Sequence, residues 1–378
     1  MAGTQIQTRR GTTAQHSAFT GAVGEITVDT DKKTVVVHDG ATAGGIVLAR
    51  SSDVSAVLNF KNRIINGGMV IDQRNAGANI TPTASAYTID RWTAYISQPS
   101  KLSVQQNAGS ITPPAGFTNY LGITSLSAYS VLSTDYFHLR QEIEGFNVAD
   151  LGWGTANAQT ITLSFRVYSS LIGTFGGVIR NGAFNRSYPF SYSIPVANTW
   201  TTISLTIAGD TTGTWATNST NGLSLAFGLG SGSTYTSTAG SWQAGSFIQP
   251  TGSVSVVGTS GATFYITGVQ LEKGSVATSF DQRAYSQELA MCQRYYQNII
   301  CSVNDNGAAA ATKFYNTSAP YQCSMRATPT AIFSALVASN VTSTTFTNIY
   351  NIGATYTVVA SGGPSMSSVS SVFLSAEL

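Results

Sequence analysis

Three aromatic residues in segments rich in glycine and hydroxyl groups are the side chains of this sequence best suited to bind a ligand. Trp215 follows Gly-Thr, Trp242 follows Gly-Ser, and Tyr235 follows Gly-Ser-Thr. A planar ring removes the apolar face of a sugar from water, while nearby hydroxyl and amide groups can hydrogen-bond the sugar's OH groups. The pattern therefore predicts a carbohydrate-contacting surface at Trp215, Trp242 and Tyr235. The alternative is that each tryptophan caps one end of a β-sandwich core.

A second group of aromatic residues lies in the last quarter of the chain. Its members are Tyr315, Tyr321, Tyr350 and Tyr356, interspersed with Asn, Ser and Thr. Tyrosine mixed with small polar residues is typical of antibody paratopes. If residues 299–378 form an exposed tip, these tyrosines are predicted to form its recognition surface. An ordinary subunit interface is the alternative.

One pair of carboxylates has a spacing that could support glycoside hydrolysis. Glu142 and Glu144 share a face of a predicted strand by period 2, and a glycosidase needs two carboxyl groups about 5–10 Å apart. Arg140 lies on the same face, so a solvated ladder of opposite charges is the simpler interpretation. The sequence contains no Gly-x-Ser-x-Gly elbow and no P-loop. We therefore predict no catalytic residue.

Metal and cofactor sites are not indicated either. The histidines and cysteines lack the spacing of metal ligands; they are His16, His38, His138, Cys292, Cys301 and Cys323. Asp210 and Glu272 are conceivable ligands of a structural calcium ion, but carboxylates are too sparse around them for a multi-acid loop. The prediction is no metal and no cofactor.

The composition limits the class of protein to which these residues belong. Of 378 residues, 42% are hydrophobic and only 10% are charged, against about 25% charged in ordinary soluble domains. No run of about 18 apolar residues could cross a membrane, and no secretory signal is evident. The net charge of +2 forms no basic stripe for nucleic acid. The 37 glycines favour β-structure with many turns, whose edges are protected by closure or oligomerisation.

The first fifty residues are predicted to form a small β-module. Strands are expected over 24–29 and 34–38, joined by 30–33 and closed by the turn pair at 39–40. Fifty residues cannot bury a sufficient core alone, so the module at 1–50 is expected to depend on partner chains.

Residues 51–61 are predicted to form a short helical linker. Ser52 could cap it, with Val54, Val57 and Leu58 on one face. That face would lie on the axis of a symmetric oligomer or pack on the next domain.

Residues 62–283 are predicted to form a jelly-roll β-sandwich. The run 161–168 alternates apolar and polar residues as a half-buried strand does, and 200–207, 223–227 and 262–267 repeat this less strictly. Within this region, Asp90 and Arg91 could form a buried ion pair.

After the sandwich, a helix is predicted at 284–298, capped by Ser286, followed by a small β-domain at 299–378. The fold class is therefore all-β, with a small N-terminal module, a central sandwich, a short helix and a C-terminal tip.

Several motifs carry a resemblance to known families. The segments Ile-Gln-Thr-Arg-Arg-Gly-Thr-Thr-Ala-Gln-His (6–16), Gly-Glu-Ile-Thr-Val-Asp-Thr (24–30) and His-Asp-Gly (38–40) resemble the N-terminal module of phage major tropism determinants and related tail fibres. The resemblance implies an intertwined, homotrimeric β-module that trimerises the chain and attaches it to other tail or baseplate proteins.

The middle of the chain resembles jelly-roll domains of phage tail and other virion proteins. The segments that carry this resemblance are 66–69, 90–92, 209–215, 268–274, 277–280 and 288–296, and 325–329 is also similar. Such jelly rolls are similar to carbohydrate-binding modules.

Together the two resemblances imply a homotrimeric tail fibre on the virion that binds a glycan of the host surface. The protein would be made in the host cytoplasm without a signal peptide, and would neither bind nucleic acid nor insert into a membrane. A purely structural virion or baseplate component is the alternative, and a polysaccharide depolymerase is a more distant one.

Overall fold

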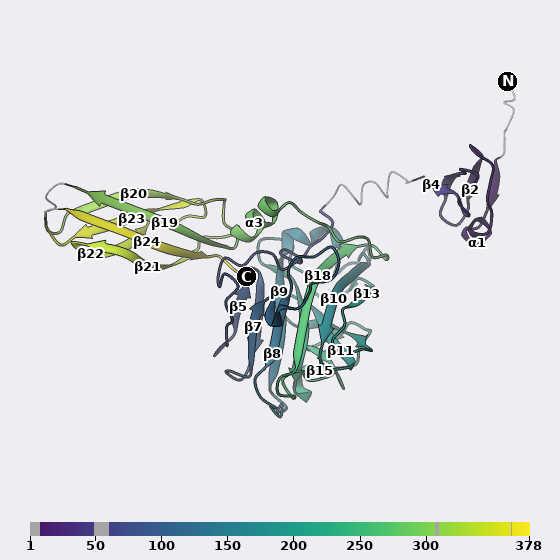
Figure 1. The fold of residues 1–378 in the computed structure, drawn as a ribbon, viewed down its shortest axis with the longest axis horizontal. Helices are drawn as coiled ribbons and strands as arrows, with labels where there is room; N and C mark the ends of the chain where they lie inside the picture. The colour runs from purple at the N-terminus through teal and green to yellow at the C-terminus, as the bar shows by residue number, and fades with distance from the viewer. Residues whose placement is uncertain (1–7, 49–59, 307–309, 364) are drawn as a thin grey trace, which may run out of the picture. The chain divides into compact units, whose positions relative to one another are not determined.

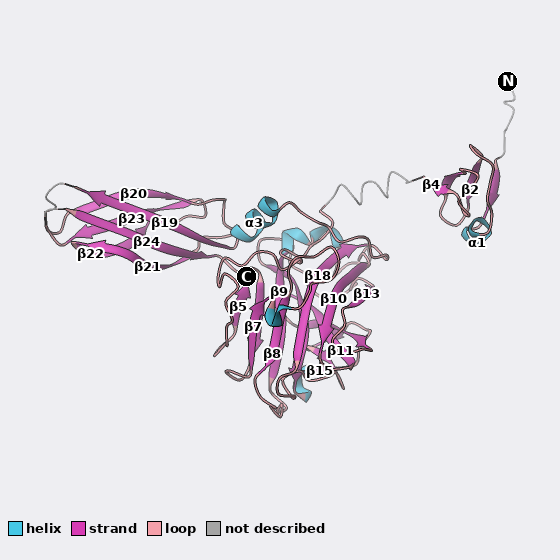
Figure 2. Cartoon of the chain, in the orientation of Figure 1, coloured by secondary structure: helices cyan, strands magenta, loops and turns pink. Residues whose placement is uncertain are grey.

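The computed structural model describes residues 8–48, 60–306, 310–363 and 365–378, and it divides the chain into two compact units. The first unit is Met1–Lys61 and the second is Asn62–Leu378. Strands dominate both units (Figures 1 and 2), so the predicted all-β class is confirmed. The residues predicted to cap and face the linker helix, 52–58, lie outside the described part of the chain.

The described residues of the N-terminal unit form a four-stranded sheet with one short helix. In spatial order the strands are β1 (Arg9–Gly11), β2 (Ile26–Asp29), β3 (Thr34–Val37) and β4 (Ile46–Val47), and α1 (Thr13–Ser17) follows β1 in the chain. The predicted hairpin is confirmed as the antiparallel pair β2–β3. Asp39 forms its closing turn by accepting backbone hydrogen bonds from Ala41 and Thr42.

Two sheets face one another in the central sandwich. The five-stranded sheet consists, in spatial order, of β13 (Thr201–Ile207), β10 (Ile161–Ser169), β18 (Thr263–Lys273), β8 (Leu121–Ser125) and β7 (Leu102–Gln106). The seven-stranded sheet consists of β16 (Gln243–Ala244), β12 (Arg186–Ile194), β11 (Gly173–Asn181), β14 (Asn221–Ser231), β9 (Tyr136–Glu144), β6 (Trp92–Ile96) and β5 (Ala86–Ile89). A parallel pair, β15 (Thr236–Ser237) and β17 (Gln249–Pro250), and four 3₁₀ turns complete it: Ala108–Ser110, Gly145–Asn147, Ala149–Leu151 and Ser233–Tyr235.

The core of the sandwich lies between the two sheets. The inward residues of β10 are Ile161, Leu163, Phe165 and Val167, and all are fully buried. The outward Thr162 is buried as well, because the segment after β18 covers it and its hydroxyl donates to the Gly274 carbonyl at 2.8 Å. The strand predicted at 161–168 is therefore confirmed, but it is more deeply buried than its alternation indicates.

The predicted helix at 284–298 is shorter than expected. The helix α3 covers Tyr285–Gln293, its N-cap is Ala284, and Ser286 makes no cap hydrogen bond. Tyr296 begins β19 instead, because its backbone pairs with Ser375 of the last strand. Pairing between distant strands thus overrides the local helical pattern.

The C-terminal domain consists of two three-stranded sheets. One contains β19 (Tyr296–Asp305), β24 (Met366–Ser375) and β21 (Thr330–Ser339), and the other β20 (Phe314–Pro320), β23 (Gly353–Ala360) and β22 (Val341–Thr347). Their facing side chains form a core of their own, and β24 alternates strictly between buried and half-buried residues.

The end of the chain joins this C-terminal domain to the sandwich. Glu377 forms ion pairs with Arg91 and with Arg74, the latter at 2.6 Å. The expected Asp90–Arg91 ion pair is therefore wrong, since Asp90 accepts hydrogen bonds from Gln73. Arg91 pairs with the carboxylate of Glu377, 286 residues further along the chain, instead of with its sequence neighbour Asp90.

Candidate functional site

Two of the predicted sugar-contacting residues lie together at one end of the sandwich. The ring centroids of Trp215 and Trp242 are 5.4 Å apart, and Trp153 packs edge-on against both, at 4.7 and 5.2 Å. The ring centroid of Tyr188 lies 5.2 Å from that of Trp242. Trp153 is buried, while Trp215 and Trp242 are half-buried. We call these four rings the tryptophan cluster; sequence reasoning missed Trp153 and Tyr188 as members, since neither lies in a glycine-rich loop.

An ion pair beneath the cluster fixes the loop that carries Trp215. Asp210 accepts hydrogen bonds from Nε and Nη2 of Arg186 at 2.7 and 2.8 Å, and a further one from the Thr212 backbone. Gly213 has a φ of +77°, and a Cβ there would lie 2.7 Å from the Arg186 side chain. Burial raises the pKa of Asp210, but the hydrogen bonds from Arg186 and Thr212 outweigh it and lower the pKa overall.

The indole N–H groups of the cluster are satisfied by the protein itself. Trp215 donates to the Thr212 carbonyl at 3.2 Å, and Trp242 donates to the Ala208 carbonyl at 2.8 Å. What these two rings can offer a ligand is therefore their apolar surface, which suits the C–H face of a sugar.

A pocket of about 230 Å³ lies beside Trp215. It is lined by uncharged residues: Val148, Ala149, Leu151, Gly152, Trp153, Thr155, Trp215, Ala216 and Thr217. This volume is below the roughly 300–1,000 Å³ of pockets for drug-sized ligands. The pocket is therefore suited to a single small, neutral group such as one sugar ring.

Tyr235 does not belong to this cluster. Its ring packs on Tyr136, the first residue of β9. The loop after Trp215 lies instead just beyond the last residue of β9, where the Phe146 N–H donates to the Asn218 carbonyl. Nine residues of β9 separate the two places, or about 25 Å at strand rise. The prediction of one surface containing Trp215, Trp242 and Tyr235 is wrong in this respect.

The four C-terminal tyrosines do not form one surface either. Tyr321 and Tyr356 lie in the core of the C-terminal domain, where the Tyr356 hydroxyl hydrogen-bonds Ser368 and Ser370 at 2.8 and 2.9 Å. Tyr350 is 60% exposed, and Tyr315 is half-buried with its hydroxyl on Asp305. These two lie at opposite ends of β20, because Tyr315 pairs with Val358 while Tyr350 bonds Gly353.

The paired carboxylates of β9 are structural. The Glu142 carboxylate binds Arg140 at 2.7 Å, and Glu144 binds Arg294 at 2.7 Å and the Tyr295 hydroxyl at 2.9 Å. Both carboxylates are largely withdrawn from solvent, so the predicted solvated ladder is wrong. Burial raises the pKa of Glu142, and the positive charge of Arg140 opposes the rise.

The conceivable calcium ligands are also engaged by the protein. Asp210 binds Arg186, and Glu272 accepts hydrogen bonds from Thr278 and Gln270. In the described ranges, no three His, Cys, Asp or Glu side chains gather as metal ligands would. No helix in those ranges is long and apolar enough to span a membrane.

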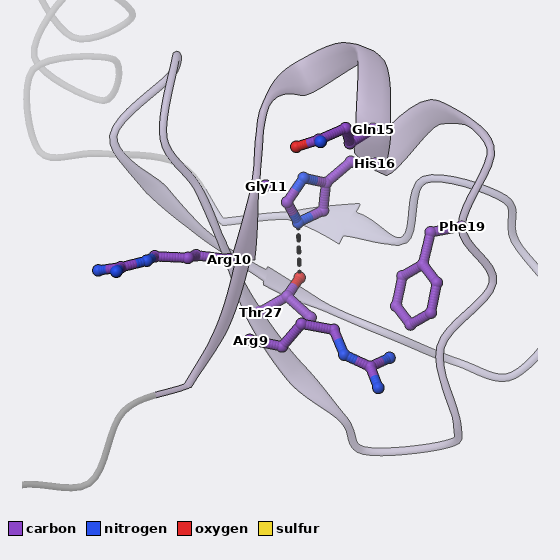
Figure 3. A pocket seen from close by; sticks show the side chains of 7 residues that line it. All are labelled: Arg9, Arg10, Gly11, Gln15, His16, Phe19 and Thr27. Carbon is purple, nitrogen blue, oxygen red and sulfur yellow. Dashed lines mark hydrogen bonds between the residues drawn. The ribbon is translucent and has the colours of Figure 1, made fainter.

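A further pocket, of about 230 Å³, lies in the N-terminal unit (Figure 3). Arg9 and Phe19 lie on one side of it, and His16 faces Thr27 across a 2.8 Å hydrogen bond. Thr27 also bonds His38 at 3.0 Å, so two histidines and a threonine form a buried polar chain. Because Gly21 donates to Nδ1 of His38, His38 must donate through Nε2 to Thr27 when neutral.

Comparison with known proteins assigns this N-terminal unit. Residues 6–42 match the family described as the major tropism determinant N-terminal domain, which confirms the N-terminal resemblance. A tail fiber receptor-binding protein of Bordetella phage BPP-1 is 77% identical over 47 residues, which is 12% of this chain and 12% of that protein. The two proteins are thus matched over only a small part of the relative's length.

Similarity to solved structures is weaker. The I1 variant of the major tropism determinant is 30% identical, covering 34% of this chain and 40% of that one, with a TM-score of 0.13. A CBM61 module in complex with β-1,4-galactotriose is 9% identical, covering 57% of this chain and 99% of that one, with a TM-score of 0.29. TM-scores this low do not support an inference about function.

Proposed function

We propose that this protein is a phage tail fibre that attaches the virion to its host by recognising a surface glycan. The observation that carries the proposal is the 77% identity of 47 residues to a tail fiber receptor-binding protein. This similarity supports a position in the tail of the virion, and we propose other tail or baseplate proteins as partners of the N-terminal module. Glycan recognition is assigned to the tryptophan cluster, whose ring surfaces and uncharged pocket suit a sugar.

We infer further that the chain assembles through its N-terminal unit, as a homotrimer according to the family resemblance. In the part of this unit that the structure describes, Val36 is the one buried large hydrophobic residue, while the other buried side chains are polar: His16, Thr27, Asp29, Thr34 and His38. The outward face of the sheet is instead apolar, with Ile26, Val37 and Ile46 in one row across β2, β3 and β4. Exposing such a face to water is unfavourable, and copies of the chain can cover it.

The glycan proposal is tested by binding of the purified full chain to host cells and to glycans extracted from their surface. Trp215→Ala or Trp242→Ala is expected to weaken binding at least tenfold, because stacking area is lost. Trp200→Ala is the matched control: Trp200 is also half-buried with its indole N–H on a backbone carbonyl, that of Thr112, but it lies on the five-stranded sheet side.

Two results would contradict the proposed function, and a third would contradict the proposed site. If the wild-type protein bound neither cells nor glycans, a purely structural virion role would be favoured. If it released sugars from polysaccharide and Glu142→Gln abolished that release, the depolymerase alternative would be favoured. Equal loss in the Trp200→Ala control would remove the tryptophan cluster as the site.

A further inference from the structure

Two arginines project from the face of the seven-stranded sheet that turns away from the core. On β9 the core-facing residues include Phe137 and Leu139, so Arg140 and Glu142 point the other way. Arg180 on β11 lies in the same row as Ser224 and Glu142, across the intervening strand β14. This face is nevertheless closed over, since β17 packs on it and Arg180 and Arg140 are only 4% and 7% exposed.

On this outward face of the seven-stranded sheet, two positive charges, those of Arg180 and Arg140, lie near one negative charge, that of Glu142. Glu142 is bound to Arg140, and no carboxylate among the described residues forms an ion pair with Arg180. Burial, and then the positive charges of Arg180 and Arg140, hold the pKa of the neighbouring His138 well below its usual value. Burial, with repulsion from Arg140, also lowers the pKa of Arg180 to about 9. The Glu142 carboxylate favours the charged form of Arg180 but is already bound to Arg140. The buried positive charge of Arg180 is therefore only partly compensated, which is unfavourable.

Specific hydrogen-bond donors are left without partners. Within the described ranges, Nε and Nη2 of Arg180 and Nε of Arg140 have no acceptor, although all three atoms are buried. The remaining terminal nitrogen of Arg180, Nη1, donates to the hydroxyl of the exposed Ser246 at 3.4 Å. One guanidinium edge of Arg180, formed by Nε and Nη2, is thus buried without an acceptor among the described residues.

Aromatic rings pack against the faces of the guanidinium groups and do not accept hydrogen bonds from that edge. The Arg140 guanidinium lies 3.4 Å from the Tyr95 ring centroid, and Phe184 lies 5.1 Å from Arg140 and 4.6 Å from Arg180. Phe184 has a φ of +54° because it lies in the turn that joins β11 to β12, where its N–H donates to the Asn181 carbonyl at 3.0 Å. A stacked guanidinium can still bind a planar anion in its own plane.

Another arginine of this protein already binds a carboxylate in the plane of its guanidinium group. Arg186 uses this same edge, Nε and Nη2, to hold both oxygens of the Asp210 carboxylate at 2.7 and 2.8 Å. We propose that the free edge of Arg180, with Arg140 beside it, binds the carboxylate of an acidic sugar. The anion site stands on the geometry alone, whereas its assignment to a sugar rests on the proposed attachment function.

Thermal unfolding of the full chain tests the proposal, with glucuronate, glucose and sulfate as probes at matched ionic strength. A ligand that binds only the folded state raises Tm. Glucuronate is expected to raise the Tm of the wild-type protein more than glucose does. In Arg180→Met that difference should disappear, and the Tm without ligand should be equal or higher, because an uncompensated buried charge has been removed.

Arg166→Gln is the matched control, since Arg166 is a half-buried arginine on the outward side of β10, and it should keep the glucuronate response. A lower Tm of Arg180→Met without ligand, together with an unchanged glucuronate response, would overturn the proposal. An equal response to sulfate and glucuronate would overturn the assignment to a sugar and leave a site for inorganic oxyanions. Host attachment is tested separately, by cell binding of the Trp215→Ala variant. Failure of the attachment proposal can therefore be distinguished from failure of the anion-site proposal.

Discussion

Three arginines of this protein, the half-buried Arg186 and the buried Arg91 and Arg180, differ in what surrounds them, and their roles differ accordingly. Arg186 holds Asp210 with two hydrogen bonds and so fixes the loop below Trp215. Arg91 binds Glu377 at the junction with the C-terminal domain. Arg180 has aromatic neighbours and a free edge. The same residue type therefore supports a loop, a domain junction and a proposed anion site.

At the residue scale, Asp210→Asn is expected to lower the free energy of unfolding at neutral pH by about 1.5–3 kcal/mol, the usual contribution of hydrogen bonds to a charged group. The pKa of Asp210 is lowered in the folded state. Its stabilising contribution is therefore fully present above the ordinary aspartate pKa of about 3.9 and is lost as the pH falls through the lower folded value.

Urea unfolding at pH 7 and at successively lower pH values, followed by tryptophan fluorescence, checks this. The difference between the wild-type protein and Asp210→Asn should shrink below about pH 4. A difference that stayed constant with pH would mean that the charge of Asp210 does not stabilise the loop.

At the scale of elements, strand pairing decides where the helix ends and how the C-terminal domain is held. Tyr296 leaves the helical pattern because β24 supplies a partner for its backbone. The same strand leads directly into Glu377, whose carboxylate is shared by Arg74 and Arg91. One strand thus organises the sheet β19–β24–β21 and fastens it to the sandwich.

Glu377→Ala is therefore expected to lower the free energy of unfolding by about 3–5 kcal/mol, since it leaves the buried Arg91 without its counter-charge. Scanning calorimetry of the full chain would measure the loss. Lys313→Ala is the control: its partner is Asp305 at 3.8 Å and the pair is substantially exposed, so a change within about 1 kcal/mol is expected. Similar effects of the two substitutions would contradict the importance of the Glu377 junction.

At the scale of the whole molecule, the two units differ in how they obtain stability. The second unit contains cores of its own in the sandwich and in the C-terminal domain. The N-terminal unit instead turns an apolar sheet face outward, with Ile26 and Ile46 50% and 55% exposed. Its stability is expected to depend on association, as the small size of the module also predicts.

Ile26→Lys combined with Ile46→Lys is therefore expected to convert the proposed trimer into monomers, because charges would be buried in the subunit interface. Light scattering on the purified full chain measures the mass. Val23→Lys is the control, since Val23 is exposed but lies in the loop between α1 and β2, outside the strands. A wild-type monomer would refute the proposed assembly.

The sequence by itself determined the all-β class, the N-terminal hairpin and the positions of the longer strands. These features depend on local alternation and turn residues such as those at 39–40. The family of residues 6–42 could also be recognised from contiguous motifs. The glycine-rich loops also single out Trp215 and Trp242 as candidate sugar contacts, a role that stays a prediction.

Only the tertiary structure decided which residues meet and which are hidden. Tyr356 lies between two threonines in the sequence yet is buried, and its hydroxyl bonds Ser368 and Ser370, two buried serines of β24. Trp153 joins the tryptophan cluster, and Arg180 lies near Arg140, through strands that are distant in sequence. Local patterns indicate which way a side chain points from its strand, but the partner that it meets depends on sheet order, and that order is fixed by the packing of the whole chain.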